Sequence, residues 1–349
     1  MGVEEELLLF TSAATPAAEG EHLAADPGTS VEHELKLEQA EIASEPRTDA
    51  DELAADLLGR RRELAAAASE RDVRVAGLAT SPVHVAPRAT PDERYERMHE
   101  RFAGVVVDQL TCGAHVHVSV DSRAEGVAVL DRIRAWLPTL VAVSANSPFW
   151  TGHDSGYASF RSIAWGRWPS AGPIELLGDV EAYDAIVTAL VASGAALDDG
   201  MVYFDARLSA RYPTVEIRVA DVGQQASDSV LLALLCRGLV DTAAADPSAP
   251  PDVPTELIRA AAWRAARYGL ADELFDPVSR VRRAAADQLD RLVEHVRPAL
   301  VASGDAERVD ALVAGLLARG GGAQVQRADL ARTGSPRGVV EAAEQRLLH

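Results

Sequence analysis

Three short segments, far apart in the chain, carry ionisable side chains at every second position: residues 2–9 (GVEEELLL), 114–120 (AHVHVSV) and 214–219 (TVEIRV). Side chains of a strand alternate between its two faces. The members that share a face are therefore the following pairs: Glu4 with Glu6, His115 with His117, and Glu216 with Arg218. In the second and third segments the intervening residues are valine and isoleucine, so the opposite face can pack on helices. The pattern predicts a sheet with one apolar face and one charged face, and the charged face suits a metal and anion site better than a solvated surface.

The length of the chain limits the number of domains that it can form. A prior of about 150 residues per domain suggests two domains for 349 residues, but large α+β enzymes also reach this size. We expect one catalytic domain over residues 1–349, with a helical C-terminal layer from about 252 to 349. A proline-rich break at 247–254 marks the start of that layer.

Charge and composition exclude several classes of partner. The formal charge of −19 argues against nucleic acid as the main partner, although a nucleotide held through divalent cations stays possible. No apolar run reaches the ~20 residues that a membrane helix needs, and no signal peptide is visible. The two cysteines, Cys112 and Cys236, do not form a disulfide framework, which favours a cytoplasmic protein. The sequence leaves the formation of a homo-oligomer open.

Lys36 is the only lysine of the chain, and it lies in the sequence HELKL. A P-loop requires lysine after a glycine-rich loop, so this class of phosphate site is excluded. Schiff-base chemistry would have to use Lys36, which lacks a supporting context. Recognition of phosphate must therefore come from arginine, metal ions or backbone amides.

The periodicity of the remaining chain predicts an α+β fold with an antiparallel sheet. Helices are expected at 49–70, 91–107 and 123–145, the last with a break near Pro138. Extended segments are expected at 31–43 and 73–80, and a hairpin at 202–208 and 214–220. After Gln224 the chain is expected to be almost wholly helical.

The three adjacent glutamates at the start of the chain are followed directly by leucines, so this strand is not an exposed tail. Buried carboxylates are costly unless cations compensate them, and oxygen ligands suit Mg²⁺ or Mn²⁺. Glu4 and Glu6 share a face and are candidate ligands, whereas Glu5 points the other way and is expected to be structural. The alternative is a solvated acidic N-terminus.

The histidine pair is ambiguous when taken alone. His115 and His117 could be polar positions on a half-exposed strand or ligands of a transition metal. Glu41, between Ala40 and Ile42, could be a plain carboxylate on an edge strand.

The charged residues of the two arginine-bearing strands could also be purely structural. Glu216 and Arg218 alone would most often form a surface pair. Asp205 and Arg207 repeat the pattern on the neighbouring strand, and a structural ion pair between them is expected.

Residues 146–178 form a long aperiodic segment that is rich in aromatic residues. Loops of this length are uncommon in compact domains unless they are functional or disordered, and the aromatic content argues against disorder. The segment indicates a substrate loop in which Arg161, together with Arg167, could bind a carboxylate or a phosphate. The alternative is a well-packed loop without a ligand.

Several motifs occur in an order that resembles a known family: GVEEE at 2–6, QAEI at 39–42, CGAHVHV at 112–118, SPFWTG at 147–152, GYASFRS at 156–162, WPSAGP at 168–173 and EIRVAD at 216–221. They resemble the carboxylate–amine ligases of the type 2 glutamate–cysteine ligase family, within the glutamine synthetase-like superfamily. The resemblance spans nearly the whole chain. It implies a curved antiparallel sheet with helices on the convex side and the site on the concave side.

The resemblance also implies roles for individual residues. The residues implied as ligands of Mg²⁺ on ATP are Glu4, Glu6, Glu41, His115 and Glu216. Arg218, Arg161 and His117 would contact ATP or the substrate, and the implied catalytic residues are Arg218, Arg161 and Glu216.

The implied reaction transfers the γ-phosphoryl group of ATP to a carboxylate, such as the γ-carboxylate of glutamate, and an amine such as that of cysteine attacks the acyl phosphate. A first alternative is a metal-dependent hydrolase that uses His115 and His117 with Glu216 and Asp221 and needs no nucleotide. A second is a nucleotide-binding relative without turnover.

Overall fold

The computed structural model describes all residues, 1–349, and its centre is one antiparallel six-stranded sheet. The strand order is β2-β1-β4-β8-β7, and β3 also pairs with β1. The bounds are β1 (Gly2–Thr11), β2 (Gln39–Ala43), β3 (Val73–Ala76), β4 (Gly113–Ser119), β7 (Ala206–Leu208) and β8 (Thr214–Asp221). Leu8 pairs with Gln39 on one side and with Ala76 on the other, so β3 and β4 follow each other along the same edge of β1. The α+β class with an antiparallel sheet is thereby confirmed.

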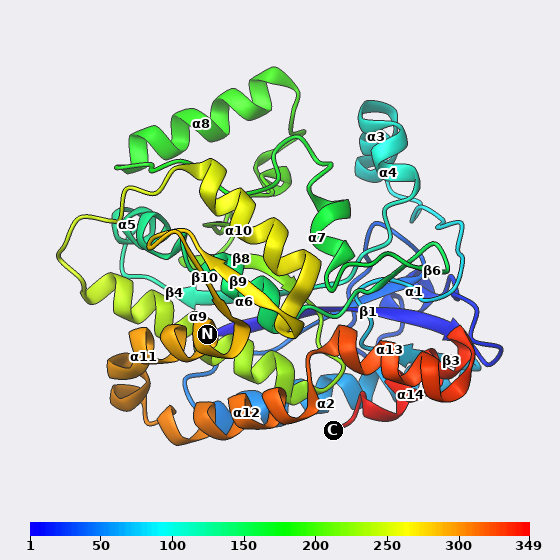
Figure 1. Cartoon of the computed structure of the whole chain (residues 1–349). Helices are drawn as coiled ribbons and strands as arrows, with labels where there is room; N and C mark the ends of the chain where they lie inside the picture. Colours follow the sequence, from blue (N-terminus) through cyan, green and yellow to red (C-terminus); the bar gives the residue numbers. More distant parts are fainter.

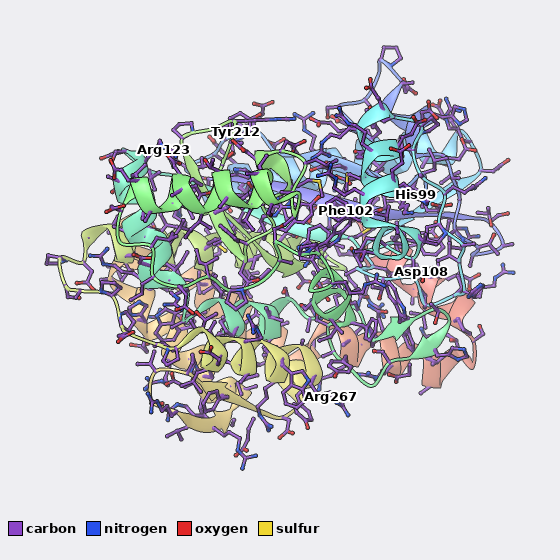
Figure 2. All side chains as sticks on the ribbon, turned by 90° about the horizontal axis from the view of Figure 1, so that it is seen from above. His99, Phe102, Asp108, Arg123, Tyr212 and Arg267 are labelled. Atoms are coloured by element: carbon purple, nitrogen blue, oxygen red, sulfur yellow. The ribbon has the colours of Figure 1, made fainter.

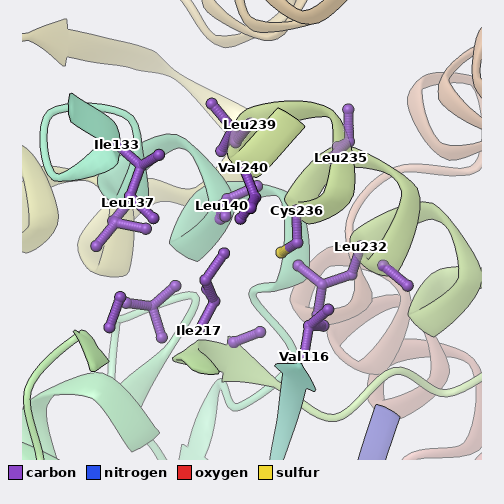
Figure 3. Packing of buried hydrophobic residues seen from close by; sticks show 14 of the residues in the cluster. Val116, Ile133, Leu137, Leu140, Ile217, Leu232, Leu235, Cys236, Leu239 and Val240 are labelled. Atoms are coloured by element: carbon purple, nitrogen blue, oxygen red, sulfur yellow. The ribbon is translucent and has the colours of Figure 1, made fainter. Parts of the chain in front are cut away.

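Helices cover one face of this sheet (Figure 1). The helices that pack there are α2 (Ala50–Ser69), α5 (Arg123–Ile133), α6 (Leu137–Ser144) and α9 (Ala226–Ala245), and α11 (Ala285–Ser303) packs on α9 and α6 behind them. The apolar residues of β4 and β8 point into this layer, and Figure 3 shows Val116 and Ile217 facing Leu140, Leu232 and Cys236. The period-two apolar pattern therefore has its expected cause, which is burial of one sheet face against helices.

Four further helices lie around the opposite face and the β7 edge of the sheet: α3 (Glu93–Phe102), α4 (Gly104–Val107), α7 (Phe160–Trp165) and α8 (Val180–Ser193), the last packed against α5. Figure 2, which looks down on this side, shows α8 in front of the sheet and α3 beside it. Phe102 at the end of α3 packs edge-to-face on Trp168, with ring centroids 5.3 Å apart. This contact joins α3 to the aromatic segment that follows α7.

The C-terminal part is mainly helical, as expected, with α10 (Thr255–Tyr268), α12 (Ala306–Arg319), α13 (Gly322–Thr333) and α14 (Pro336–Arg346). It also contains a two-stranded hairpin, β9 (Glu273–Asp276) with β10 (Val281–Ala284), where the sequence predicted helix. Asp276 forms this turn by accepting hydrogen bonds from the Val278 and Ser279 amides, and Arg280 has a φ of +58°. The division into a single domain with a layer from about residue 252 stays a prediction.

Most other predicted elements form but are shorter. The 123–145 helix is interrupted before Pro138, which lies in the first turn of α6, a position where proline is tolerated. The 91–107 helix is divided at Ala103, which has a φ of +44°. Within the expected extended segment 31–43 only β2 forms a strand, and within the expected strand 202–208 only β7 does. The minor elements are α1 (Gly20–Ala24), β5 (Phe149–Trp150), β6 (His153–Asp154) and two 3₁₀ turns, Asp199–Met201 and Gly269–Ala271.

None of the helices combines the length and the apolar character that crossing a membrane would require.

Candidate functional site

The three charged segments of the sequence become neighbouring strands. Glu4 of β1 is paired with His115 of β4, and His117 of β4 is paired with Glu216 of β8. Directly opposite residues of an antiparallel pair have their side chains on the same face. Glu4 consequently lies between the two histidines, with Glu4 Oε2 3.4 Å from His115 Nδ1 and Glu4 Oε1 3.3 Å from His117 Nε2.

Two overlapping groups of candidate metal ligands result. The first contains Glu4, Glu41 and His115, and the second contains Glu4, His117 and Glu216. Within each group the potential ligand atoms all lie within 4.8 Å of one another. Glu4 belongs to both groups, so its two carboxylate oxygens could bridge neighbouring ions.

The histidines are in a state suited to coordination. Burial, reinforced by the nearby Arg218, lowers the pKa of His115 to about 4, which leaves the ring neutral at neutral pH. The Nε2 atoms of both His115 and His117 are buried; that of His115 has no hydrogen-bond partner, and that of His117 faces only Glu4 Oε1. Burial alone would raise the pKa of Glu4, but hydrogen bonding and charge interaction with the two histidines hold it well below its usual range. Unpartnered buried nitrogens beside an ionised carboxylate are what a bound cation would satisfy.

A second set of carboxylates crowds together next to these residues. Glu6 is paired with Glu41 across β1 and β2. Burial and the charge of Glu34 raise the pKa of Glu6 to about 8, and burial with Glu34 and Glu4 also raises the pKa of Glu41. The Gly113 amide donates a 2.6 Å hydrogen bond to Glu6. These carboxylates lack sufficient positive charge within the protein, and divalent cations would stabilise their ionised forms.

Glu34 is a member of this set that sequence reasoning missed. It becomes a neighbour of Glu41 because the chain folds back on itself, with a backbone bridge between Glu32 and Glu41. Alternation within 31–43 could not reveal this, since the turn between the two carboxylates interrupts the strand period. The acidic residues of that segment are the only signal that could have pointed to it.

Two arginines bind Glu216 from opposite sides. Arg207 Nε donates a 2.8 Å hydrogen bond to Glu216 Oε2, and Arg218 donates to Oε1. Burial opposes ionisation of Glu216, but Arg218 and Arg207 outweigh it and lower its pKa to about 2. The expected ion pair between Asp205 and Arg207 is wrong, because Arg207 lies directly opposite Glu216 in the β7–β8 register. Arg207 is thus a second site residue that sequence reasoning missed.

Arg161 lies in the first turn of α7 and is almost fully buried, with 2% of its surface exposed. Its guanidinium donates to the backbone carbonyls of Arg218 and Val219, while its Nε has no partner. It covers Gly113, where an added Cβ would approach Arg161 Nη2 to 2.3 Å. Arg167 donates instead to Gln109, and its guanidinium stacks on the Trp150 ring. Its proposed role as a clamp stays a prediction, as does that of Arg161.

Asp221, a proposed ligand of the hydrolase alternative, has another set of partners. Its carboxylate accepts hydrogen bonds from the Asn146 amide and from the hydroxyls of Ser147 and Ser159. Neither group of candidate ligands contains Asp221. It thereby holds together the start and the end of residues 146–159, the part of the aperiodic segment that we call the aromatic loop.

The remaining residues noted in the sequence are structural. Glu5 points away from the site and forms a fully buried 2.6 Å ion pair with Arg61, as expected. Cys112 is buried and accepts a hydrogen bond from Gln39. Lys36 is 2% exposed, and its ammonium donates to the Val107 carbonyl, so it is poorly placed for Schiff-base chemistry.

Comparison with known proteins gives a consistent picture. The model of glutamate–cysteine ligase family 2 (GCS2) matches residues 1–345. A protein of Streptomyces avermitilis, provisionally named glutamate–cysteine ligase 2-1, is 51% identical over 350 residues, which cover 97% of each chain. A Streptomyces coelicolor protein with the provisional name glutamate–cysteine ligase 2 is also 51% identical, over 99% of this chain and 98% of its own.

Two solved structures have the same fold at low sequence identity. A glutamate–cysteine ligase of Francisella tularensis in complex with AMP has a TM-score of 0.69 at 14% identity, covering 99% of this chain and 88% of its own. A bifunctional glutathione synthetase of Pasteurella multocida also has a TM-score of 0.69, at 13% identity, covering 99% of this chain and 52% of its own.

Proposed function

Because the chain belongs to glutamate–cysteine ligase family 2, and is a carboxylate–amine ligase, we propose that it uses ATP to activate a carboxylate as an acyl phosphate, which an amine then converts to an amide. Glutamate and cysteine are the first acid and amine to test. The AMP bound to the Francisella tularensis ligase supports a nucleotide substrate. The observation that carries the proposal is the joint position of Glu4 between His115 and His117 on a face crowded with carboxylates.

The donor set of this face fits Mg²⁺ or Mn²⁺. The residues that would hold the ions are Glu4, Glu6, Glu41, His115 and Glu216. Glu34 is a further candidate, because it lies beside Glu6 and Glu41 in the structure. The fit is supported by the unpartnered Nε2 of His115 and by the raised pKa values of Glu6 and Glu41. Bound divalent cations would supply neutralisation of the charge on the ATP phosphates.

The arginines of the site would contribute fixed positive charge. Arg218 keeps its Nε free of hydrogen bonds and lies beside the candidate metal ligand Glu216. Arg207 holds Glu216 from the other side and thereby fixes the orientation of its carboxylate. Such a preorganised arrangement suits phosphoryl transfer, in which catalysis is largely positioning and charge stabilisation.

The proposed reaction balances in two steps. An oxygen of the substrate carboxylate attacks the γ-phosphorus of ATP, and the bond from that phosphorus to the β,γ-bridging oxygen breaks, releasing ADP. The amine nitrogen then attacks the acyl carbon, the bond from carbon to the phosphate oxygen breaks, and the nitrogen loses a proton. The products are the amide, ADP and inorganic phosphate.

Family membership does not favour the hydrolase alternative, and Asp221 lies outside both ligand groups. A catalytically silent relative would bind ATP without forming product. A substrate panel therefore decides between turnover and binding alone.

The test combines that panel with the Glu216→Gln variant. We expect the wild-type protein to release ADP over many turnovers only when Mg²⁺, an acid and an amine are all present, with the amide detected by mass spectrometry. Loss of the Glu216 charge should lower kcat by about 10²–10³-fold, the range found for removal of one electrostatic contact at a transition state. Glu181→Gln on the exposed side of α8 is the matched control and should behave as wild type.

Thermal unfolding of both variants separates activity from folding. A folded Glu216→Gln enzyme with wild-type turnover would remove Glu216 from the site. Product formation without nucleotide would contradict the ligase reaction itself.

A further inference from the structure

A cavity of about 340 Å³ opens beside the arginine end of the site. Its walls come from β8 and the residues just before β7, from α7 and the segment after it, from α10, and from one residue of α6. This volume is within the range of small-molecule sites, which begins at about 300 Å³. Trp263 of α10 lines the cavity and is 47% exposed, which places a large aromatic side chain at an open edge.

The charge of this lining is asymmetric. Four arginines contribute to it: Arg161, Arg167, Arg218 and Arg259. Asp205 is the only acidic residue of the lining. The cavity therefore attracts anions over most of its wall and can attract a cation at one position only.

The register of the sheet directs Asp205 toward the site. The Arg218 amide donates to the Asp205 carbonyl, and the next pair along the strands is Ala206 with Ile217. In this register Asp205 lies directly opposite Arg218 on the neighbouring strand. The side chains of two opposite residues are on the same face of the sheet. Glu216, with its two arginines, is on this same face.

Asp205 has no partner within the protein. Its carboxylate forms neither a hydrogen bond nor an ion pair, unlike Asp198 seven residues earlier, which is bound by Arg94. Burial raises the pKa of Asp205 to about 7, although the charges of Arg161 and Arg259 oppose the rise. Asp205 is half-buried in the wall of the cavity, and a carboxylate without a protein partner at this position is available to a cationic ligand.

We propose that this cavity is the subsite for the attacking amine, that Asp205 binds the amine nitrogen, and that the preferred acceptor is an α-amino acid whose carboxylate meets the arginines. The assignment rests on the proposed function. It follows from the single acidic group of the lining, since an ammonium group has no other counter-charge there. Arg259 has no ion pair or side-chain hydrogen bond within the protein, so it is free to bind the acceptor carboxylate.

Asp205 would also take part in the proton balance. The ammonium form of the acceptor must lose one proton before its nitrogen attacks the acyl carbon, and the resulting amide nitrogen must lose another. A carboxylate with a pKa near 7 is matched to accept a proton at neutral pH. The carbon–oxygen bond to phosphate breaks in the same step, so the electron pair leaves with inorganic phosphate.

The test separates activation of the acid from capture of the amine. The Asp205→Asn variant is supplied with ATP, Mg²⁺ and glutamate, and with either cysteine or hydroxylamine. Hydroxylamine is small, is uncharged at neutral pH, and traps an acyl phosphate as a hydroxamate. We expect amide formation with cysteine to fall about 100-fold or more, with a raised KM for cysteine, while hydroxamate formation stays within about threefold of wild type.

Two controls complete the design. Asp199→Asn is the matched variant on an exposed residue outside the cavity and should resemble wild type in both reactions. Arg259→Gln should raise the KM for cysteine more than that for cysteamine, which lacks the carboxylate.

The outcomes distinguish this inference from the proposed function. Equal losses of amide and hydroxamate in Asp205→Asn would overturn the assignment, because Asp205 would then serve the acid or the fold. Wild-type amide formation in the folded variant would also overturn it. A wild-type protein that forms neither product nor ADP across the substrate panel would instead overturn the proposed function, and this inference with it.

Discussion

At the scale of single residues, β1 gives adjacent glutamates different environments. Glu4 faces the site and contacts two histidines, whereas Glu5 faces the helices and is fully buried with Arg61 and Ser229. Arg61 also donates to three backbone carbonyls, those of Gly223, Gln224 and Leu347. The alternation of strand side chains thus places a candidate metal ligand and a structural ion pair at two consecutive positions.

The same substitution at these two positions should have opposite effects. Glu5→Gln leaves the Arg61 charge buried without its counter-ion, and we expect the free energy of unfolding to fall by about 3–5 kcal/mol. Glu4→Gln should change it by less than about 1 kcal/mol but abolish Mg²⁺-dependent turnover. Urea denaturation and ADP release measure the two effects. A stable Glu5→Gln protein, or an active Glu4→Gln protein, would contradict this division.

The sequence suffices to place residues within a strand, but not residues whose position depends on the register between strands. Period-two alternation is enough to predict the shared face of Glu4 with Glu6, of His115 with His117 and of Glu216 with Arg218. It cannot pair Arg207 with Glu216, because the offset between β7 and β8 is set by their connection.

Glu34 escapes prediction for a related reason. Its approach to Glu41 depends on a turn that has no clear signal in the sequence. The position of Glu34 depends on a connection between strands, and that of Arg207 depends on the register that such a connection sets. Alternation of side chains along a single strand predicts neither position.

At the scale of elements, the aromatic loop is an ordered part of the molecule because β8 anchors it. Asp221 binds the loop at Asn146, Ser147 and Ser159, and Ser147 Oγ in turn accepts from the Arg161 amide. The loop is therefore connected to the start of α7, which carries a wall of the cavity.

Asp221→Asn should loosen this connection without unfolding the core. An amide side chain cannot accept all the hydrogen bonds that the carboxylate accepts, and each lost bond to a charged group is worth about 1.5–3 kcal/mol. We expect hydrogen exchange in 146–162 to rise at least about tenfold, with α9 unchanged. Exchange measured by mass spectrometry tests this, and equal protection of the loop in both proteins would show that packing alone holds it.

Secondary elements are predictable where the apolar period is long. The helix expected at 49–70 forms as α2, and the side chain of Asp49 caps it by accepting from the Asp51 and Glu52 amides. The β9–β10 hairpin escapes prediction because its strands are four residues each and the flanking sequence has a helical period. Its turn depends on hydrogen bonds made by Asp276, which composition does not reveal.

At the scale of the whole molecule, the last helices fasten the chain to the beginning of the sheet. Val340, Ala343 and Leu347 join the apolar cluster that contains Leu7 to Phe10 of β1. Asp329 of α13 binds Arg346 of α14 through both carboxylate oxygens, at 2.7 and 3.0 Å.

The contribution of this ion pair should depend on pH. Burial would raise the pKa of Asp329, but hydrogen bonds from Arg346 and Arg332 outweigh it and lower the value. A carboxylate with a lowered pKa in the folded state stabilises the protein above its unfolded pKa, and this stabilisation is lost as the pH falls through the folded pKa. Asp329→Asn should therefore reduce the free energy of unfolding by about 1–3 kcal/mol at pH 7 and by less near pH 3.

Denaturation of wild type and Asp329→Asn at both pH values checks this prediction. Asp199→Asn again provides the control, since that carboxylate is exposed and makes no ion pair. A stability difference that stays constant from pH 7 to pH 3 would exclude the ion pair as its cause.

The burial of Lys36, the only lysine, would have a consequence for the proposed reaction, in which an activated acyl group is formed. Protein surfaces ordinarily present many lysine amines, and each is a nucleophile that could capture a mixed anhydride escaping from its site. Here the arginines that cover the surface are far weaker nucleophiles, because their charge is delocalised and permanent. Under the proposed reaction the molecule would be protected against acylating lysine side chains of its own, and reagents that target lysine should leave Lys36 almost unmodified while the protein is folded.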